Sequence, residues 1–393
     1  MAQSADVVVI GGGVNGASTA FHLAQRGLKV ALLERTVLAG GASGKSGALV
    51  RMHYTNPLDA SLAQLSLPYF QHWGDLVGHG DPAFRPVGVV RLVPARYNDA
   101  LRANVDMLRG VGVNTEVISA DELREIDPGV YTGDIDVAAW EPESGFAEPA
   151  ATVYGFAAAA KAMGASIHEG VEATAILTEG EKVTGVATPL GAIATETVVA
   201  VPGAYTNELL NPLGLDYGLM ANRVQIAILR RTADDFSHPV YIDGPNGTWL
   251  RPEGEFGTLT GVLRDQLGVD PDYYDEGVDF DYIRDARQRC ARRRPALTHA
   301  FMRGGWAGVI TMSPDSHAII DQLAPYAGLY GILGDSGTNF KTAPAIGKSM
   351  AEWIVDGAPH SVDLHPFRAS RFAEGSLFAG EHEYGEGLLD VFR

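Results

Sequence analysis

Three glycines with a fixed spacing are the first residues in this chain whose types could do chemistry. Gly11, Gly13 and Gly16 form the pattern G-x-G-x-x-G directly after the apolar run Asp6–Ile10, which we expect to be a buried parallel strand. Gly11 would allow a tight turn, Gly13 would let the backbone approach a pyrophosphate, and Gly16 would let the next helix pack against the strand. This spacing predicts a site for the phosphates of a nucleotide.

The elements that follow complete a nucleotide-binding unit. We expect a helix over Ala17–Arg26 that ends at Gly27, and then a second strand over Leu28–Leu33. Glu34 closes this strand, where its carboxylate could accept both hydroxyl groups of a ribose, and an acidic residue there disfavours a 2′-phosphate. The unit predicts an adenine dinucleotide, and by itself it leaves FAD and NAD both open.

The next segment favours FAD. An NAD-binding fold would continue into a helix and a third strand, whereas Leu38–Pro57 has the sequence LAGGASGKSGALVRMHYTNP, which is rich in Gly, Ser and Ala. A loop of this composition suits close approach of the backbone to a large flat cofactor.

Four later stretches carry a resemblance to a known family. They are Glu141–Thr174, Thr195–Leu210, Gly304–Asp321 and Leu329–Ile354. The first resembles that family's helix and strand near the adenine, and the second resembles its apolar strand followed by Gly-Ala. The third resembles the family's late strand pair, and the fourth resembles its last strand with a glycine loop and helix. Over most of its length the chain therefore resembles the FAD-dependent amine oxidoreductases of the D-amino acid oxidase and sarcosine oxidase group. The Trp-Ala-Gly at Trp306 is more similar to the β subunit of heterotetrameric sarcosine oxidases than to the monomeric enzymes.

The resemblance implies an α/β fold with two interleaved domains. A Rossmann-type FAD-binding domain of the glutathione-reductase-like kind would alternate with an α+β substrate-binding domain that has an antiparallel sheet. The FAD-binding domain would comprise residues 1–87, 146–214 and 301–393, and the substrate-binding domain residues 88–145 and 215–300. The alternating stretches GVVRLVPA and NRVQIAILRR favour strands in these inserts.

The resemblance also implies which residues would contact FAD. They come from the glycine turn, the end of the second strand, the glycine-rich loop, the middle segment and the last glycine loop. The expected contacts are Gly11, Gly13, Val14, Asn15, Gly16, Glu34, Arg35, Ser43, Lys45, Ser46, Gly47, Ala48, Leu49, Val171, Gly203, Trp306, Gly334, Asp335, Gly337, Thr338, Asn339, Phe340 and Lys341.

The same resemblance implies how a substrate would be held. The flavin would take a hydride equivalent from a carbon next to an amine, while the protein holds the substrate over the ring. Arg51 and Lys341 would together bind the substrate carboxylate. His53 would face the same site as Arg51 if the segment is extended, because alternate residues then share one side, and a structural histidine is the alternative. No dedicated acid or base is expected if the amine binds neutral.

The segment around Lys341 is predicted to be a turn at Gly334–Gly337 and then a helix from Thr338, with Pro344 near its first turn. The positive end of this helix would face the pyrimidine edge of the flavin and stabilise the reduced form. Asp335 would either contact a second polar group of the substrate or cap this helix.

Departures from the family pattern shape further expectations. Some members attach the flavin through a histidine or a cysteine where this chain has Lys45 and Gly308, so FAD is expected to be non-covalent. Gly257–Gly261 lacks the lysine that speeds reaction with oxygen in the simplest oxidases, which leaves O2 and another electron acceptor both open. The aromatic residues that contact the methylamine in sarcosine oxidases are replaced near Leu250 and Ile310, so sarcosine itself is not favoured.

Composition narrows the class of partner and the compartment. A net charge of −18 and a pI of about 5.0 argue against binding to nucleic acid or to an anionic membrane. Cys290 is the only cysteine, so an intrachain disulfide is impossible and a reducing compartment is expected. The thiol is predicted to be partly buried and structural, with a reactive thiol as the alternative. No signal peptide or spanning apolar run is found, and no metal site is predicted. We therefore expect a cytoplasmic protein.

Taken together, these features predict an FAD-dependent oxidoreductase that oxidises the C–N bond of a small anionic amino acid with a secondary, N-methyl or cyclic amine. Two other enzyme classes stay open: a dehydrogenase acting on the CH–OH group of a hydroxy acid or polyol, and the FAD subunit of a larger amine dehydrogenase complex. A non-catalytic nucleotide-binding scaffold is a further alternative. Both homo- and hetero-oligomers remain possible assemblies.

Overall fold

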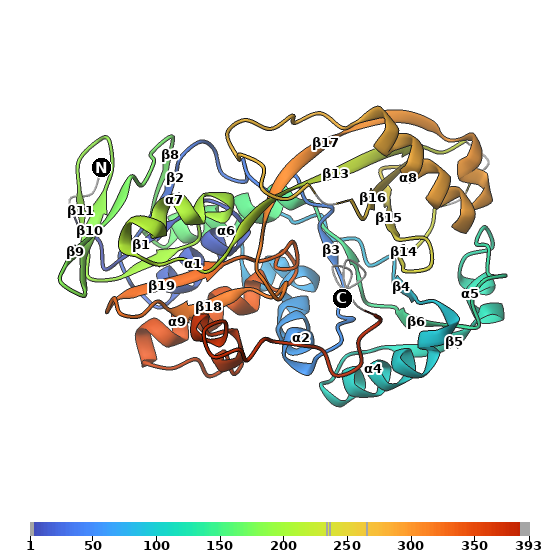
Figure 1. Cartoon of the computed structure of the whole chain (residues 1–393), viewed down its shortest axis with the longest axis horizontal. Helices are drawn as coiled ribbons and strands as arrows, with labels where there is room; N and C mark the ends of the chain where they lie inside the picture. The colour runs from blue at the N-terminus through green and yellow to red at the C-terminus, as the bar shows by residue number, and fades with distance from the viewer. Residues whose placement is uncertain (1–3, 233–234, 236, 265, 386–393) are drawn as a thin grey trace.

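The computed structural model of this chain describes residues 4–232, 235, 237–264 and 266–385, and it is built around two large β-sheets (Figure 1). The first sheet has six strands in the order β18-β19-β12-β1-β2-β8, and all neighbours are parallel except β18 and β19. Its strands are β1 (Val7–Ile10), β2 (Val30–Glu34), β8 (Ser166–Glu169), β12 (Val198–Ala200), β18 (Ile319–Gln322) and β19 (Leu329–Leu333). Strands from the beginning, middle and end of the chain thus share one sheet, as the predicted fold class requires.

Helices cover this sheet because its central strands are apolar on both sides. All four residues of β1 are buried, as expected for a strand in the middle of a parallel sheet. Helix α1 contacts α6 and α9, and the hydroxyl of Ser18 in α1 donates to the carbonyl of Ala343 at 2.8 Å. The helices around this core are α1 (Val14–Gln25), α2 (Pro57–Gln71), α3 (Trp73–Leu76), α6 (Pro149–Ala162), α7 (Thr206–Leu210) and α9 (Ala343–Asp356).

The second sheet has eight strands in the order β17-β13-β16-β15-β14-β4-β6-β5. They are β4 (Val89–Leu92), β5 (Glu116–Ser119), β6 (Val137–Glu141), β13 (Met220–Arg230), β14 (Val240–Asp243), β15 (Thr248–Glu253), β16 (Gly257–Val262) and β17 (Phe301–Met312). All neighbours are antiparallel except β4 and β14, which join the two inserts. Helices α4 (Asn98–Gly110), α5 (Ala120–Ile126) and α8 (Phe280–Arg293) accompany this sheet (Figure 1). The strands predicted from GVVRLVPA and NRVQIAILRR are confirmed as β4 and β13.

Smaller elements connect these layers. A three-stranded sheet consists of β9 (Ala175–Glu179), β10 (Lys182–Ala187) and β11 (Ile193–Ala194), and a short ladder pairs β3 (Leu49–Val50) with β7 (Gly145–Phe146). Short 3₁₀ helices are found at η1 (Ala95–Tyr97), η2 (Gly203–Tyr205), η3 (Asn211–Leu213), η4 (Pro295–His299), η5 (His365–Phe367) and η6 (Ala369–Arg371).

The structure corrects several predicted boundaries. Helix α1 begins at Val14 rather than Ala17, because the backbone of Gly13 is already extended and serves as its N-cap. The predicted strand over Leu28–Leu33 is displaced to β2, which starts at Val30 and includes Glu34. The helix predicted from Thr338 was wrong, since α9 begins at Ala343. Pro344 explains this start, because a proline lacks the N–H of a helix interior and its ring clashes with the carbonyl four residues earlier.

Strand β17 also differs from its expected environment. We assigned residues from 301 onward to the FAD-binding domain, yet Phe301–Met312 pairs along most of its length with β13 in the eight-stranded sheet. The domain limits themselves remain a prediction. The pairing nevertheless shows that the chain returns from the second sheet to the first only after β17.

Two observations complete the description of the fold. Cys290 lies fully buried in α8, where its Sγ is 3.1 Å from the hydroxyl of Thr260, and burial raises the pKa of the thiol to about 12. This position agrees with a structural thiol. Among the described residues, no helix is long and apolar enough to cross a membrane.

Candidate active site

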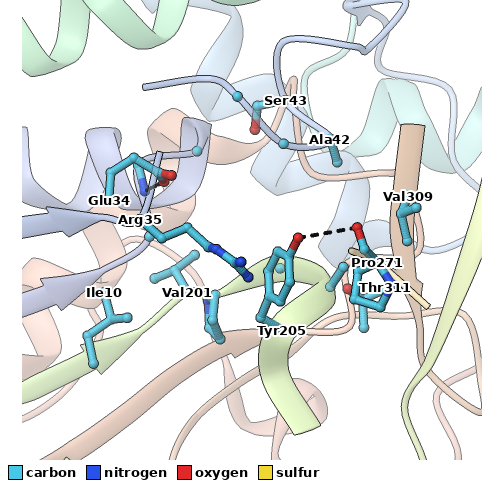
Figure 2. Close-up of a pocket in the computed structure, with 18 of the residues that line it drawn as sticks. Ile10, Glu34, Arg35, Ala42, Ser43, Val201, Tyr205, Pro271, Val309 and Thr311 are labelled. Atoms are coloured by element: carbon cyan, nitrogen blue, oxygen red, sulfur yellow. Dashed lines mark hydrogen bonds between the residues drawn. The ribbon is translucent and has the colours of Figure 1, made fainter. Parts of the chain in front are cut away.

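A cavity of about 550 Å³ opens where the carboxyl ends of β1, β2 and β12 meet strand β17. Its wall includes the β1–α1 turn, residues 40–45, residues 172–174, the segment from Val201 to Leu209, and part of a loop from the second insert (Figure 2). The volume lies within the range of about 300–1,000 Å³ that is usual for ligand and cofactor sites. The open end of a parallel sheet is also where such sites form in α/β folds.

The β1–α1 turn forms the base of this cavity and depends on its glycines. Gly11 has a φ of +114°, and an added Cβ would lie 2.1 Å from the carbonyl oxygen of Val201. An added Cβ at Gly16 would lie 1.9 Å from the carbonyl oxygen of Gly11, so the helix can approach the strand only without a side chain there. Ser43 accepts a hydrogen bond from the N–H of Val14 at 2.9 Å, which fixes the glycine-rich loop over the first turn of α1.

Glu34 lies at the end of β2 on the edge of the cavity. One carboxylate oxygen accepts from the N–H of Gly12 at 2.8 Å, and the other accepts from the N–H and hydroxyl of Thr36 at 2.8 and 2.9 Å. Each carboxylate oxygen can accept more than one hydrogen bond, so the group is oriented and keeps acceptor capacity for a ribose.

Arg35 and Tyr205 form the next part of the wall. The guanidinium carbon of Arg35 lies 4.0 Å from the centre of the Tyr205 ring, and the guanidinium pairs with Asp272 at 3.0 Å. Figure 2 shows the two side chains together, with the Tyr205 hydroxyl directed at Pro271, where it donates to the carbonyl at 3.3 Å. A loop of the second insert is thereby fixed over this end of the cavity.

Lys45 makes the second connection to that loop. Its ammonium donates to the hydroxyl of Tyr274 at 2.5 Å and to the carboxylate of Glu276 at 2.8 Å. Burial opposes the charge, but these two partners hold the pKa of Lys45 above its usual value. Trp306 on β17 donates to the carbonyl of Lys45 at 2.8 Å, which ties the same residue to the eight-stranded sheet.

The structure separates the predicted cofactor contacts into two sets. Those that line the cavity are Gly11, Gly13, Val14, Asn15, Glu34, Arg35, Ser43, Lys45, Gly203, Gly334 and Asp335. Those that do not line it are Gly16, Ser46, Gly47, Ala48, Leu49, Val171, Trp306, Gly337, Thr338, Asn339, Phe340 and Lys341.

Local contacts explain several of the residues outside the cavity wall. The N–H of Val171 donates to the carbonyl of Glu34 at 2.9 Å, just after β8 ends at Glu169, and the next three residues line the cavity instead. An added Cβ at Gly47 would lie 2.5 Å from the Trp249 ring, which places this glycine against the second sheet. The ring of Phe340 packs on Phe70 at 6.0 Å within the apolar core.

Other lining residues were missed by the sequence analysis. They are Ile10, Gly12, Leu33, Thr36, Gly40, Gly41, Ala42, Glu172, Ala173, Thr174, Val201, Pro202, Ala204, Tyr205, Glu208, Leu209, Pro271, Tyr274, Glu276, Val309, Ile310, Thr311 and Ile332. Gly40–Ala42 lie inside the glycine-rich loop that signalled the site, so their neighbours could have found them. The residues of the 271–276 loop carry no local signal, because only the packing of the insert brings them to the cavity.

Arg51 and Lys341, predicted as a pair, do come together. The guanidinium carbon of Arg51 lies 4.9 Å from the centre of the Tyr54 ring, and the ammonium of Lys341 lies 5.0 Å from the same ring centre. Their exposed fractions are 5% and 6%. Arg51 donates to the carbonyl of His53, and Lys341 donates to the carbonyl of Thr338 at 2.7 Å. Within the part of the chain that the structure describes, neither cation forms an ion pair with an acidic side chain.

Lys341 carries the clearest electrostatic signature in this cluster. Burial and the charge of Arg51 hold the pKa of the Lys341 ammonium well below its usual value, although Asp59 and Asp335 oppose the shift. Two buried positive charges on the same aromatic ring repel each other, and a bound anion would offset this repulsion. The arrangement is therefore suited to bind a carboxylate.

His53 is buried beside the pair, but not for the reason predicted. Residues 51–54 belong to no strand and all four are buried, so the argument from alternating residues does not apply. Burial and the charges of Arg91 and Arg51 hold the pKa of His53 well below its usual value, which keeps the ring neutral. Its Nε2 lies 2.6 Å from the hydroxyl of Tyr384.

Asp335 lines the cavity but does not cap α9. Its carboxylate accepts from the N–H of Gly337 at 3.1 Å, and α9 starts several residues later at Ala343. Burial raises the pKa of this carboxyl group. Of the two roles weighed for Asp335, capping of that helix is excluded, and contact with a bound molecule remains.

Comparison with known proteins identifies the family. The model of the FAD dependent oxidoreductase family (DAO) matches residues 6–353. The chain belongs to this family. It is therefore an FAD-dependent oxidoreductase, and the predicted family, fold and cofactor are confirmed.

Individual relatives and solved structures extend over nearly the whole chain. The chain is 26% identical over 384 residues to a sarcosine oxidase subunit beta of Arthrobacter sp, which covers 95% of this chain and 93% of that protein. It is 27% identical over 396 residues to a peroxisomal sarcosine oxidase of Mus musculus, covering 94% of this chain and 96% of the other. The crystal structure of L-proline dehydrogenase from P. horikoshii is similar with a TM-score of 0.89 and 25% identity, covering 96% of this chain and 100% of that one.

The cavity fits FAD by its own geometry. The glycine turn at its base tolerates no Cβ at Gly11, where a side chain would clash with the backbone of Val201, and the N-terminus of α1 provides positive partial charge for a pyrophosphate. Glu34 lies where a ribose would follow. Strand β17 contributes Val309 and Ile310 as an apolar wall suited to a flat ring.

FAD is expected to bind without a covalent link. Lys45 and Gly308 stand at the two positions expected to carry the flavin link in some family members. They lie side by side, since an added Cβ at Gly308 would be 3.1 Å from the Cβ of Lys45. Neither residue is the histidine or cysteine that forms such a link. Acid precipitation of the purified protein should therefore release all yellow colour to the supernatant, and a yellow pellet after washing would contradict this.

Proposed function

We propose that this protein oxidises the C–N bond of a small amino acid with a secondary amine, N-methylated or cyclic, using FAD as the hydride acceptor. The names of its relatives support this class, because sarcosine and proline are both secondary amino acids. The single observation that carries the proposal is the buried pair Arg51 and Lys341 on the Tyr54 ring.

The pair Arg51 and Lys341 is evidence for a small anionic substrate. Buried charges in proteins are normally paired, and here no acidic side chain of the described residues pairs with either cation. A substrate carboxylate would complete the cluster, and a planar guanidinium can bind it through two hydrogen bonds. Tyr54 would then fix where both cations stand, and hence where the amine-bearing carbon lies.

We propose that the cavity-lining residues named above hold FAD. Gly11, Gly13 and Val14 would face the pyrophosphate, Glu34 the ribose, and Ser43 and Lys45 the segment that leads to the ring. When bound, FAD supplies a ring that accepts a hydride equivalent from the substrate carbon. The part of this chain is to bind and orient the substrate and to exclude water, since His53 is neutral and no side chain needs to remove a proton from a neutral amine.

We further propose that the electron acceptor is not O2 but another molecule or chain. The stretch Gly257–Gly261 forms the buried strand β16, and it holds no lysine where the family's simplest oxidases have one. A relative whose name includes "subunit beta" and a structural neighbour that is a dehydrogenase agree with an acceptor other than oxygen, and with association into a larger assembly.

An anaerobic bleaching experiment tests both proposals. Purified protein is mixed with N-methyl, cyclic, D- and L-amino acids and with hydroxy acids, and the absorbance of the flavin band is followed. We expect a secondary amino acid to bleach the band, and colour to return slowly in air but quickly with an artificial acceptor.

Other outcomes of this experiment contradict one proposal or the other. Fast return of colour in air would mean an oxidase and remove the proposal on the acceptor. Bleaching by a hydroxy acid and by no amine would mean CH–OH oxidation and overturn the proposed substrate class. Size-exclusion chromatography of the native protein, with and without cell extract, tests the assembly.

A further inference from the structure

The C-terminal segment, residues 376–385, crosses back to the substrate end of the molecule. In Figure 1 it runs from the region of α9 and β18, past α2, toward the ladder of β3. The N–H of Glu381 donates to the carbonyl of Thr55 at 2.8 Å, and the side chain of Asn104 in α4 donates to the carbonyl of His382 at 2.8 Å. The segment is thus bonded directly to the stretch that carries Arg51 and His53.

Tyr384 is the residue of this segment that reaches the site. It is 3% exposed, and its hydroxyl lies 2.6 Å from Nε2 of His53. The two rings are stacked with centres 5.9 Å apart, and the guanidinium carbon of Arg91 lies 4.9 Å from the centre of the tyrosine ring. Tyr384 follows α9, the last α-helix, by almost thirty positions, yet it is buried like a core residue.

The hydrogen bond of Tyr384 assigns the proton between it and His53. Among the described residues, the hydroxyl of Tyr384 has no hydrogen-bond partner other than Nε2 of His53. Nε2 is therefore the only acceptor for this buried O–H, and the pair is satisfied best when the hydroxyl donates and Nε2 accepts. A neutral imidazole whose Nε2 accepts carries its proton on Nδ1.

The Nδ1 of His53 is left with a hydrogen to donate and no acceptor. It is buried and has no hydrogen-bond partner among the described residues. An unpartnered buried donor is rare in folded proteins and indicates a missing partner. Arg51 donates to the backbone carbonyl of the same histidine, and its charge lowers the pKa of the His53 ring, so the imidazole lies close to the proposed carboxylate site.

We propose that Tyr384 is a positioning residue of the substrate site, which holds His53 as an Nδ1–H donor so that His53, Arg51 and Lys341 together bind the substrate carboxylate. The inference rests on the proposed function and adds to it a third donor and the residue that orients it. The family match ends at residue 353, so Tyr384 lies outside the region that this chain shares with the family model.

The test uses acetate as a carboxylate probe, because it needs no oxidation to report binding. Holoenzyme is titrated with acetate while the flavin spectrum is followed, for the wild type, Tyr384→Phe and Tyr273→Phe. Tyr273 is 88% exposed and serves as the matched control. We expect Tyr384→Phe to weaken acetate binding about tenfold, the usual effect of losing one hydrogen bond to a charged group, and Tyr273→Phe to leave it unchanged.

Two further measurements separate positioning from simple loss of packing. FAD content and melting temperature should be the same in the two variants and the wild type. In a His53→Gln background, Tyr384→Phe should cause no additional loss of acetate binding, because its effect acts through His53. If a substrate is found, the rate of flavin reduction at saturation should change little while its apparent affinity falls.

The possible failures can be told apart. Unchanged acetate affinity in Tyr384→Phe, or an equal extra loss in the His53→Gln background, overturns the role of Tyr384 whatever the substrate is. Absence of bleaching by any amine overturns the proposed function, while the acetate titration still reports whether Tyr384 positions a carboxylate donor. A lower melting temperature together with lost FAD in Tyr384→Phe would assign the residue to folding and overturn the inference.

Discussion

Replacing Gly11 with alanine is expected to yield a protein that no longer retains FAD. The added Cβ would lie 2.1 Å from the carbonyl oxygen of Val201, a backbone atom that cannot turn aside, and the φ of +114° is one that alanine rarely adopts. The β1–α1 turn must therefore shift at the base of the cavity. Strain of this kind costs about 1–3 kcal/mol, so the affinity for FAD should fall by about fivefold to about a hundredfold, and the ratio of flavin absorbance to protein absorbance after gel filtration should fall with it.

Gly110→Ala provides the matched control for this variant. It ends α4, and no atom lies within 4 Å of the Cβ that alanine would add. This variant should keep full FAD content, and circular dichroism should show that both variants are folded. A Gly11→Ala protein as yellow as the control would mean that the turn is not part of the cofactor site.

The glycine turn could be predicted from the sequence because every feature of it is local. A buried strand, three spaced glycines, a helix and an acidic residue follow one another within the first 34 residues, and the structure keeps that order in β1, α1 and β2. The predicted bounds were displaced by a few residues, since the extended backbone of Gly13 and the packing of the strands set the ends. A unit of this kind can be predicted from the pattern of neighbouring residues alone, because it does not depend on contacts with the rest of the chain.

The far wall of the cavity could not be predicted in this way. Tyr274 and Glu276 reach Lys45 only because an insert folds into a separate sheet and its loop returns across the cavity. Tyr384 is a similar case, since it reaches His53 from beyond the last helix. No periodicity links residues that are hundreds of positions apart, so these contacts depend on the tertiary arrangement alone.

The start of helix α9 was predicted incorrectly, although the motif around it was recognised. The turn at Gly334 and the proline at 344 were both recognised, but the helix was started too early. Pro344 excludes helical structure around Phe340, and the residues in between instead form turns that direct Lys341 into the interior. The lysine thus reaches Tyr54 from a turn and not from a helix.

Replacing Lys341 with methionine is expected to abolish tight binding of the amino acid while FAD is retained. Methionine keeps most of the volume of the side chain, so the loss is that of one of two cations on the carboxylate. Truncating one partner of such a buried charged contact costs about 2–5 kcal/mol, so kcat/KM should fall by about thirtyfold or more, at about 1.4 kcal/mol per tenfold. Lys348→Met is the matched control, because Lys348 is half-exposed on α9 and should tolerate the change.

The pH dependence of acetate binding should identify Lys341 as the charged group. Burial and Arg51 hold the pKa of Lys341 well below its usual value, so its charge is present at low pH and is lost as pH rises, earlier than for an exposed lysine. Over the pH range in which acetate is ionised, its affinity for the wild type should fall with rising pH as this lysine loses its proton. Lys341→Met should bind acetate weakly with little dependence on pH, whereas Lys348→Met should follow the wild type. A Lys341→Met protein that keeps the wild-type pH profile would show that another group carries the charge, and the carboxylate would then have to bind elsewhere.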